Sequence, residues 1–166
     1  MSGPGVLHQL FYTEPAGRFV FGHVFRSAEV FWDPDTIAER DDTGLWHCDI
    51  GDRNRLTWSE AVYELFGLPV GKPVSRELAV SRYSEQSKIA LERVRSFAIR
   101  SGCAFILDAA LTPAGADNRW IRVLAIPIVE DDRVVGLHGL KRSLEHTGMR
   151  RSKKAVRPSS REANPA

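Results

Sequence analysis

The sequence predicts an α+β domain in which a five-stranded antiparallel sheet carries its helices on one face. Three observations lead to this fold class. Short segments rich in β-branched and aromatic residues recur from Gly44 onward and are separated by turn residues. Helical patterns stand between the second and third of these segments. The last three segments are joined by hairpin-length links, which favour antiparallel neighbours.

The first two strands are predicted at residues 45–50 and 55–58. The first ends at Gly51-Asp52, and Asp52-Arg53-Asn54 supplies the turn between them. Ser59 then stands at a helix N-cap position. Apolar residues repeat at helical spacing from that cap until Gly67, which is suited to end the helix.

The long helix is predicted at residues 84–101. Its apolar stripe includes Ile89, Leu91, Val94 and Phe97, and Gly102 follows the last turn. Residues 72–83 precede it and contain a short turn or helix around residues 78–80.

Three longer strands are predicted at residues 104–112, 119–129 and 133–144, with links at 113–118 and 130–132. These three form the middle and one side of the sheet, and the first two strands return to its other side. Helices inserted between the second and third strands then close over the concave face. This arrangement predicts a small chamber suited to a ligand.

Several stretches resemble the PAS domain, and together they cover residues 44–144. Residues 44–50 (GLWHCDI) look like the first PAS strand, and residues 56–60 and 63–69 look like the second strand and first helix. Residues 118–123 (NRWIRV) and 134–140 (VVGLHGL) resemble the fourth and fifth strands. Their order and spacing carry the resemblance.

Two places depart from the PAS pattern. Many relatives have a His-Pro-x-Asp turn before the long helix, where this chain reads SRYSE at residues 81–85. Many end in Asp-Ile-Thr, where this chain reads Ser143-Leu-Glu145. The resemblance implies a bacterial sensory module that binds a ligand or partner and forms a homodimer, and whose signalling partner is unknown. The two distant cysteines, which form no CxxC pair, favour a cytoplasmic protein.

Two extensions flank the predicted domain at residues 44–146. Residues 1–43 form a partly ordered N-terminal extension with an aromatic stretch at 19–32 and a short helix predicted at 37–40. Such a stretch either caps its own domain or supplies contact area between two copies. The candidate dimerisation residues are Phe21, Phe25, Phe31 and Trp32.

Residues 147–166 form a basic tail that is predicted to be disordered. From Met149 onward it holds six Lys and Arg against one acid, although the whole chain has a net charge of only +2. The alternative function is therefore a DNA-associated transcriptional regulator that dimerises through the PAS-like domain. The residues that would contact nucleic acid are Arg150, Arg151, Lys153 and Lys154.

Composition and motifs favour a binding module over an enzyme. No phosphate-binding loop, dinucleotide fingerprint or HExxH motif is present, and the five histidines show no ligand spacing. No apolar run approaches the ~18 residues of a membrane span, and no secretion signal is recognisable. We therefore expect no catalytic residues, no metal site and no membrane association.

The candidate pocket residues come from the inward faces of the strands and from the first helix. They are Trp58, Tyr63, Phe66, Phe105, Leu107, Ile121, Val123 and His138. Ile121, Val123 and Ala125 share one uniformly aliphatic strand face, which we place inward. The same side chains equally suit a filled core without a cavity, and the ligand itself is not predicted.

Motifs for haem or flavin are not recognisable, and the cofactor is unknown. The cysteine motif of light-sensing flavin relatives is missing, and the long helix has no histidine. His138 remains the candidate iron ligand, against an ordinary strand histidine. Cys48 and Cys103 are either redox-sensing thiols or small buried hydrophobic residues.

Overall fold

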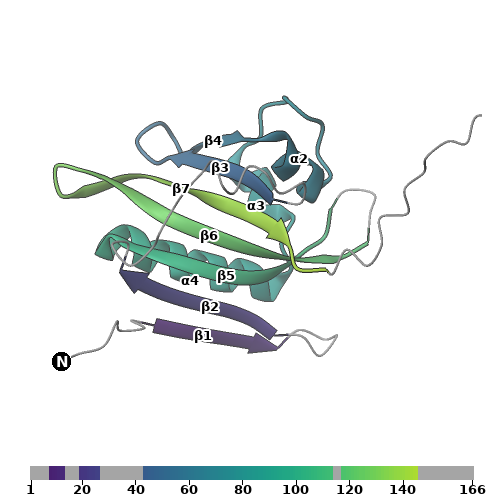
Figure 1. The fold of residues 1–166 in the computed structure, drawn as a ribbon, viewed down its shortest axis with the longest axis horizontal. Coiled ribbons are helices and arrows are strands. Elements are labelled where there is room, and N and C mark those ends of the chain that lie inside the picture. Colours follow the sequence, from purple (N-terminus) through teal and green to yellow (C-terminus); the bar gives the residue numbers. More distant parts are fainter. Residues whose placement is uncertain (1–7, 14–18, 27–42, 114–116, 146–166) are drawn as a thin grey trace, which may run out of the picture.

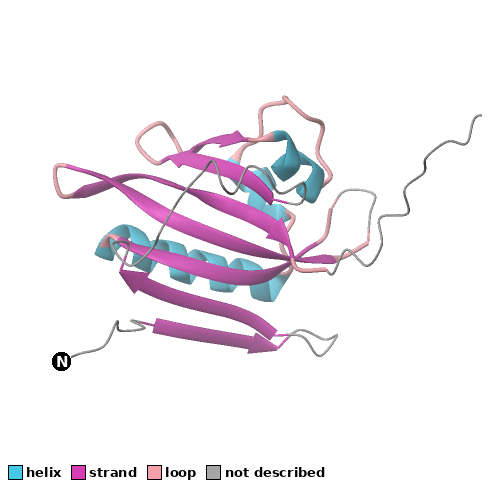
Figure 2. Ribbon diagram, in the orientation of Figure 1, coloured by secondary structure: helices cyan, strands magenta, loops and turns pink. Residues whose placement is uncertain are grey.

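The computed structural model describes residues 8–13, 19–26, 43–113 and 117–145 (Figures 1 and 2). Its elements follow one another as β1 (His8–Thr13), β2 (Phe19–Arg26), β3 (Thr43–Asp49), β4 (Arg55–Trp58), α2 (Glu60–Phe66), α3 (Arg76–Ser81), α4 (Glu85–Ser101), β5 (Cys103–Leu111), β6 (Arg119–Glu130) and β7 (Arg133–Ser143). The predicted α+β class and the order of elements from β3 to β7 are confirmed.

All described strands belong to one antiparallel sheet in the order β1-β2-β5-β6-β7-β3-β4. The last three strands form consecutive hairpins, as their short links predicted. β3 returns to pair with β7, so that Trp46 lies opposite Gly139. The first two predicted strands therefore lie on the far side of β7, where the sequence placed them.

The sheet has seven strands, two more than the sequence predicted. The additional strands come from the N-terminal extension, where β1 and β2 form a hairpin and β2 continues the sheet at the edge of β5. Apolar residues occupy adjacent positions at 19–21 and 24–25, so no alternation of apolar and polar residues marks β2 in the sequence. Val24 is fully buried toward α4, whereas His23 and Phe25 lie on the other face.

The three described helices gather on one face of the sheet, which we call the inner face; the opposite face is the outer face (Figure 1). α4 packs across β5 and β2, and α2 packs against β3. Gly67 and Gly102 end α2 and α4 in the left-handed region, with φ of 64° and 63°. Both positions suit glycine because a Cβ is disfavoured there.

Serines begin the three helices in two different ways. The side chains of Ser75 and Ser84 cap α3 and α4 by accepting hydrogen bonds from Leu78 and Ser87 backbone N–H groups. Ser59 occupies the predicted cap position of α2, but its hydroxyl accepts a hydrogen bond from the Leu45 N–H at 2.9 Å. Ser59 therefore ties α2 to β3.

The core lies between the inner face and the helices. The inward residues predicted on β6, namely Ile121, Val123 and Ala125, are at most 1% exposed. On the neighbouring β5, Phe105, Leu107 and Ala109 are buried in the same layer. Alternation along both strands thus produces one continuous apolar surface under α4.

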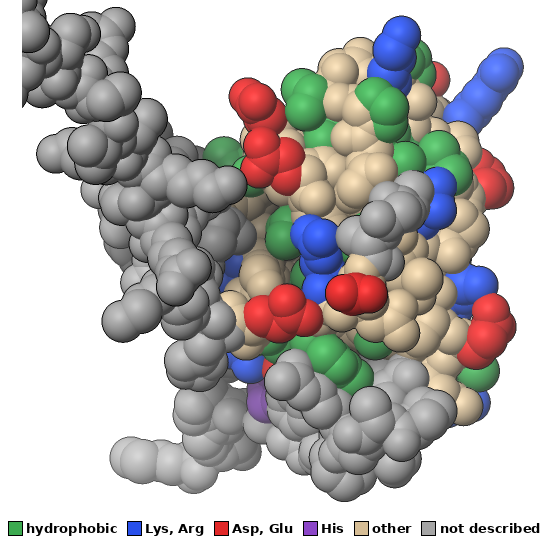
Figure 3. All heavy atoms as spheres, turned by 90° about the vertical axis from the view of Figure 1, so that its right-hand side faces the viewer, with side chains coloured by type: hydrophobic (Ala, Val, Ile, Leu, Met, Phe, Trp, Pro, Cys, Tyr) green, Lys and Arg blue, Asp and Glu red, His purple; other side chains and the backbone are tan. Residues whose placement is uncertain are grey.

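Several sequence predictions fall on residues that the structure does not describe. These are the short helix at residues 37–40, the side chains of Phe31 and Trp32, and the tail at 147–166. None of the helices in the described ranges is long and apolar enough to cross a lipid bilayer. Acidic and basic side chains are interspersed on the end of the molecule shown in Figure 3.

Candidate functional site

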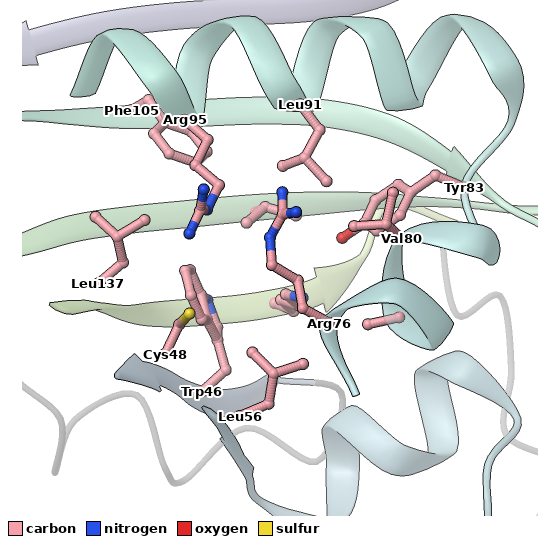
Figure 4. A pocket seen from close by; sticks show the side chains of 13 residues that line it. Trp46, Cys48, Leu56, Arg76, Val80, Tyr83, Leu91, Arg95, Phe105 and Leu137 are labelled. Atoms are coloured by element: carbon pink, nitrogen blue, oxygen red, sulfur yellow. The ribbon is translucent and has the colours of Figure 1, made fainter. Parts of the chain in front are cut away.

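A cavity of about 50 Å³ lies between the inner face of the sheet and helices α3 and α4 (Figure 4). Its walls combine apolar side chains with three cations and one tyrosine. The lining residues are Trp46, Cys48, Leu56, Arg76, Ala79, Val80, Tyr83, Leu91, Arg95, Phe105, Val123, Leu137 and Lys141.

Lys141 is the most unusual residue of this cavity because it is a buried lysine on a central strand. Its side chain projects from the inner face of β7, and the residue is only 7% exposed. Four aromatic rings surround its ammonium group. The distances from Nζ to the ring centres are 4.6 Å for Phe66, 5.1 Å for Trp46, 5.4 Å for Trp58 and 5.9 Å for Tyr83.

Burial changes the acid–base behaviour of Lys141. Desolvation of the ammonium group lowers its pKa to about 7, and the neighbouring Cys48 thiol opposes this only in part. The ring faces attract a cation, which also partly offsets the desolvation. Lys141 therefore changes charge near neutral pH, where an ordinary lysine is fully protonated.

Two arginines bring further positive charge into the same space. Arg76 from α3 forms an ion pair with Glu92 on α4. Arg95 from α4 donates to the Asn54 side-chain oxygen at 2.6 Å. Figure 4 shows both guanidinium groups directed into the cavity from these two helices.

Tyr83 and Cys48 supply the other polar atoms at the cavity. Tyr83 is 4% exposed, and its hydroxyl has no hydrogen-bond partner among the described residues. Desolvation raises the pKa of this hydroxyl, so it remains a hydrogen-bond donor at neutral pH. Burial also raises the pKa of the Cys48 thiol, although Arg95 opposes the shift.

The predicted pocket residues occupy three different places on the inner side. Phe105 and Val123 line the cavity, whereas Leu107 and Ile121 are fully buried in the core beside it. Trp58 and Phe66 do not line the cavity, but their rings belong to the aromatic cluster around Lys141. Tyr63 contacts Trp58 edge-on, and its hydroxyl donates to the Lys72 carbonyl.

His138, which the sequence placed in the pocket, does not line this cavity, because it lies on the outer face. Side chains alternate between the two faces along β7. Leu137 and Lys141 point inward, so His138, which directly follows Leu137, points outward. It pairs across the strands with His47, and both border a shallow outer groove. Burial and the nearby His47 lower the pKa of His138.

Sequence reasoning missed the polar residues of the cavity. Lys141 has the same strand parity as Leu137, which indicates an inward lysine once the core face is known. Arg76 and Arg95 gave no such signal, because charged residues on helices are ordinarily solvent-exposed. Their convergence depends on how α3 and α4 pack over the sheet.

The candidate dimerisation residues within the described ranges lie on β2. Phe21 pairs in register with Asp108, and Phe25 pairs with Ala104. The Phe25 ring is half-buried and contacts His23, with ring centres 5.8 Å apart. The outer face beyond them carries half-buried apolar residues, namely Ile106, Leu124, Ile126 and Leu140.

Cys103 is buried near the start of β5, and burial raises the pKa of its thiol. Both free cysteines thus lie in surroundings that disfavour the reactive thiolate. Across the described part of the chain, no group of three His, Cys, Asp or Glu residues is placed to hold a metal ion.

The architecture is similar to that of solved sensor domains. An RNA-binding light-oxygen-voltage receptor matches 62% of this chain with a TM-score of 0.55 and 17% identity. The match spans only 29% of that receptor. The N-terminal domain of a diguanylate cyclase with a PAS/PAC sensor, from Marinobacter aquaeolei, matches 61% of this chain and 94% of its own, with a TM-score of 0.56 and 16% identity.

A third similar structure is a domain of a light and redox sensing histidine kinase from Haloarcula marismortui. It matches 67% of this chain and 97% of its own, with a TM-score of 0.56 and 16% identity. No protein-family profile matches this chain, and no curated protein matches it significantly. The chain therefore has a PAS-like fold, extended by the β1–β2 hairpin.

Proposed function

We propose that this protein is a PAS-type sensory and signal-transduction module that responds to a small ligand bound in the cavity beside Lys141. The observation that carries the proposal is the cation-lined cavity on the inner face of a PAS-like sheet. Stability alone gives no reason to place three cations beside an apolar cavity, because burying charge is costly. Such an arrangement is typical of a binding site.

The position of Lys141 provides a physical route for a signal. Lys141 lies on the inner face of β7, and its neighbours Leu140 and Arg142 lie on the outer face of the same strand. A ligand that changes the charge or packing of Lys141 would bias the conformation of β7. Strands β6 and β3 are hydrogen-bonded to β7 on either side, so the bias extends across the sheet.

Self-association through the outer face is the second part of the proposal. Ile106, Leu124 and Leu140 lie opposite one another on adjacent strands, and they form a half-buried apolar band. The Arg122 side chain forms a two-point salt bridge with Asp108 beside this band, at 2.7 and 2.8 Å. A polar border around an apolar centre is a common feature of protein interfaces.

The proposal is tested by native mass spectrometry of the gently purified chain, combined with hydrogen exchange. A bound metabolite would add mass that is lost on denaturation. Its removal should increase exchange in α3 and at the centre of β7, and it should change the monomer–dimer ratio. The sensory function would be excluded if the hydrogen-exchange pattern of the chain stayed the same after addition of each small molecule tested and after addition of a cellular extract.

The basic tail supports a second candidate function as a nucleic-acid-associated regulator. Its six Lys and Arg between residues 149 and 166 would attract phosphate groups by counterion release. Deleting residues 149–166 should then abolish duplex DNA binding at moderate salt. Absence of DNA binding by the intact chain would exclude this function and leave the sensory proposal unaffected.

A further inference from the structure

We propose that the ligand is a small monocarboxylate, whose carboxylate group is held by Arg76, Arg95 and the Tyr83 hydroxyl. This inference rests on the proposed function, because it assigns a chemical class to the occupant of the same cavity. Three independent features carry it. They are the excess of positive over negative charge at the cavity, the unpartnered Tyr83 hydroxyl and the size of the cavity.

The charge around the cavity is unbalanced. Its walls include Arg76, Arg95 and Lys141, and no acidic residue is among the lining residues. Arg76 has an ion-pair partner in Glu92, but the partner described for Arg95 is the neutral Asn54 side chain. Converging cations repel one another strongly where water is excluded. A bound anion would reverse that repulsion into attraction.

One donor at the cavity, the Tyr83 hydroxyl, lacks an acceptor among the described residues. Arginine and lysine side chains only donate hydrogen bonds, and the buried Tyr83 hydroxyl has no partner in the described structure. In Figure 4 this hydroxyl points into the cavity on the side of Arg76. An ionised carboxylate is acceptor-only and planar, so that one group satisfies the hydroxyl and a guanidinium fork together.

The cavity size restricts the ligand to a very small acid. A volume of about 50 Å³ accommodates about three to five heavy atoms, since one water needs roughly 10–15 Å³ by this measure. Acetate and propionate fall within that range. The remaining walls are mostly apolar, with Leu91, Leu137 and Val80 beside the cations, so a short alkyl group is favoured over a second charge.

Binding should depend on pH through Lys141. The charged and titratable groups facing it are Cys48 on β3, Arg76 on α3, Tyr83 just before α4, and Arg95 on α4. Desolvation of the ammonium group, which the Cys48 thiol opposes only in part, lowers the pKa of Lys141 to about 7. An anion favours the protonated amine, so carboxylate affinity should decrease as pH rises from 6 to 9.

The experiment is a calorimetric titration of the full chain with sodium acetate, propionate and hexanoate at pH 6.5. Sodium chloride at matched ionic strength and propionamide serve as ligand controls. We expect saturable binding of acetate or propionate and much weaker binding of hexanoate. Tyr83→Phe should weaken binding about tenfold because it removes a hydrogen bond to a charged group.

Lys141→Met should weaken binding by tenfold or more and remove its pH dependence, whereas the exposed Lys72→Met variant should bind like wild type. Tyr83→Phe removes only a hydroxyl without a described partner, so it tests binding in a folded protein. Equal binding of propionamide and propionate, or unchanged affinity in both cavity variants, would overturn the carboxylate assignment while leaving a sensory cavity. Binding of none of these compounds would overturn the carboxylate assignment, whereas the sensory proposal is decided separately by the native mass spectrometry and hydrogen exchange.

Discussion

The ammonium group of Lys141 lies 4.6 Å from the centre of the Phe66 ring. Lys141 lies on β7, the last described strand in the sequence, and Phe66 lies on α2, the first described helix. The contact therefore joins parts of the PAS-like region that are far apart in the sequence. It places a titratable cation within the apolar core. The acid–base state of one side chain thereby becomes coupled to the stability of the whole fold.

The first prediction concerns the pH dependence of stability at Lys141. Its pKa is lowered to about 7 from the ordinary 10.5, so the unfolded chain binds more protons between these values. Unfolding free energy therefore increases with pH across this window, and below pH 7 the folded state carries the full cost of the buried charge. Lys141→Met should stabilise the protein by about 2–4 kcal/mol at pH 6.

The difference in unfolding free energy between Lys141→Met and the wild type should become smaller as the pH approaches 9. It is measured by urea unfolding in carboxylate-free buffer. Lys72→Met removes an exposed lysine and should show a constant, small difference from wild type. Because the cysteine and tyrosine groups titrate in both proteins, the difference isolates Lys141. A Lys141→Met variant that is less stable than wild type at pH 6 would contradict the assignment.

The second prediction concerns Gly139, which lies opposite Trp46 on the inner face. A Cβ at this position would lie 1.8 Å from the Leu124 carbonyl oxygen. The same oxygen accepts a hydrogen bond from the Trp46 indole at 3.2 Å. Gly139→Ala should therefore destabilise the fold by at least about 3 kcal/mol, because backbone atoms must move.

Gly51→Ala is the matched control for Gly139→Ala. Its new Cβ would lie 3.5 Å from the Asp49 side chain, which is an ordinary contact. We expect a change in unfolding free energy within about 0.5 kcal/mol by urea denaturation. Near-identical stability of the two variants would contradict the close approach of Gly139 on β7 to the Leu124 carbonyl on β6.

The third prediction concerns Ser87, which is fully buried on α4. Its hydroxyl accepts a hydrogen bond from the Ala110 N–H at 2.9 Å and thus joins α4 to β5. Ser87→Ala should lower the unfolding free energy by about 1–3 kcal/mol, because a buried donor loses its acceptor. Ser81→Ala removes an exposed hydroxyl on α3 and should have little effect in the same thermal and urea measurements.

The fourth prediction concerns self-association through the outer face. Leu124 lies opposite Ile106 and Leu140 at the centre of the apolar band. Leu124→Glu should weaken dimerisation at least tenfold in sedimentation experiments, because it places a charge in the interface. Val129→Glu changes an exposed residue near the β6–β7 turn and should leave the dimer unchanged. A monomeric wild-type chain would exclude the dimer outright.

The sequence determined most of the sheet because its signals are local. Turn residues such as Asp52 and Asn54 lie between strands, and alternation on β6 placed Ile121 and Val123 in the core. The β1–β2 hairpin was missed because apolar residues occupy adjacent positions of β2, at 19–21 and 24–25, so apolar and polar residues do not alternate there. Its position at the edge of β5 depends on long-range pairing, which local patterns do not encode.

The cavity was decided by the tertiary structure alone. In the sequence, Arg76 and Arg95 look like ordinary exposed helical residues. Only the packing of α3 and α4 over the sheet directs them into the cavity beside Lys141. The misplacement of His138 has the same origin, since strand parity separates the two faces but does not identify which one the helices cover. The sequence therefore determined which strand residues share a face of the sheet. The packing of the helices on the sheet determined which side chains come together at the cavity.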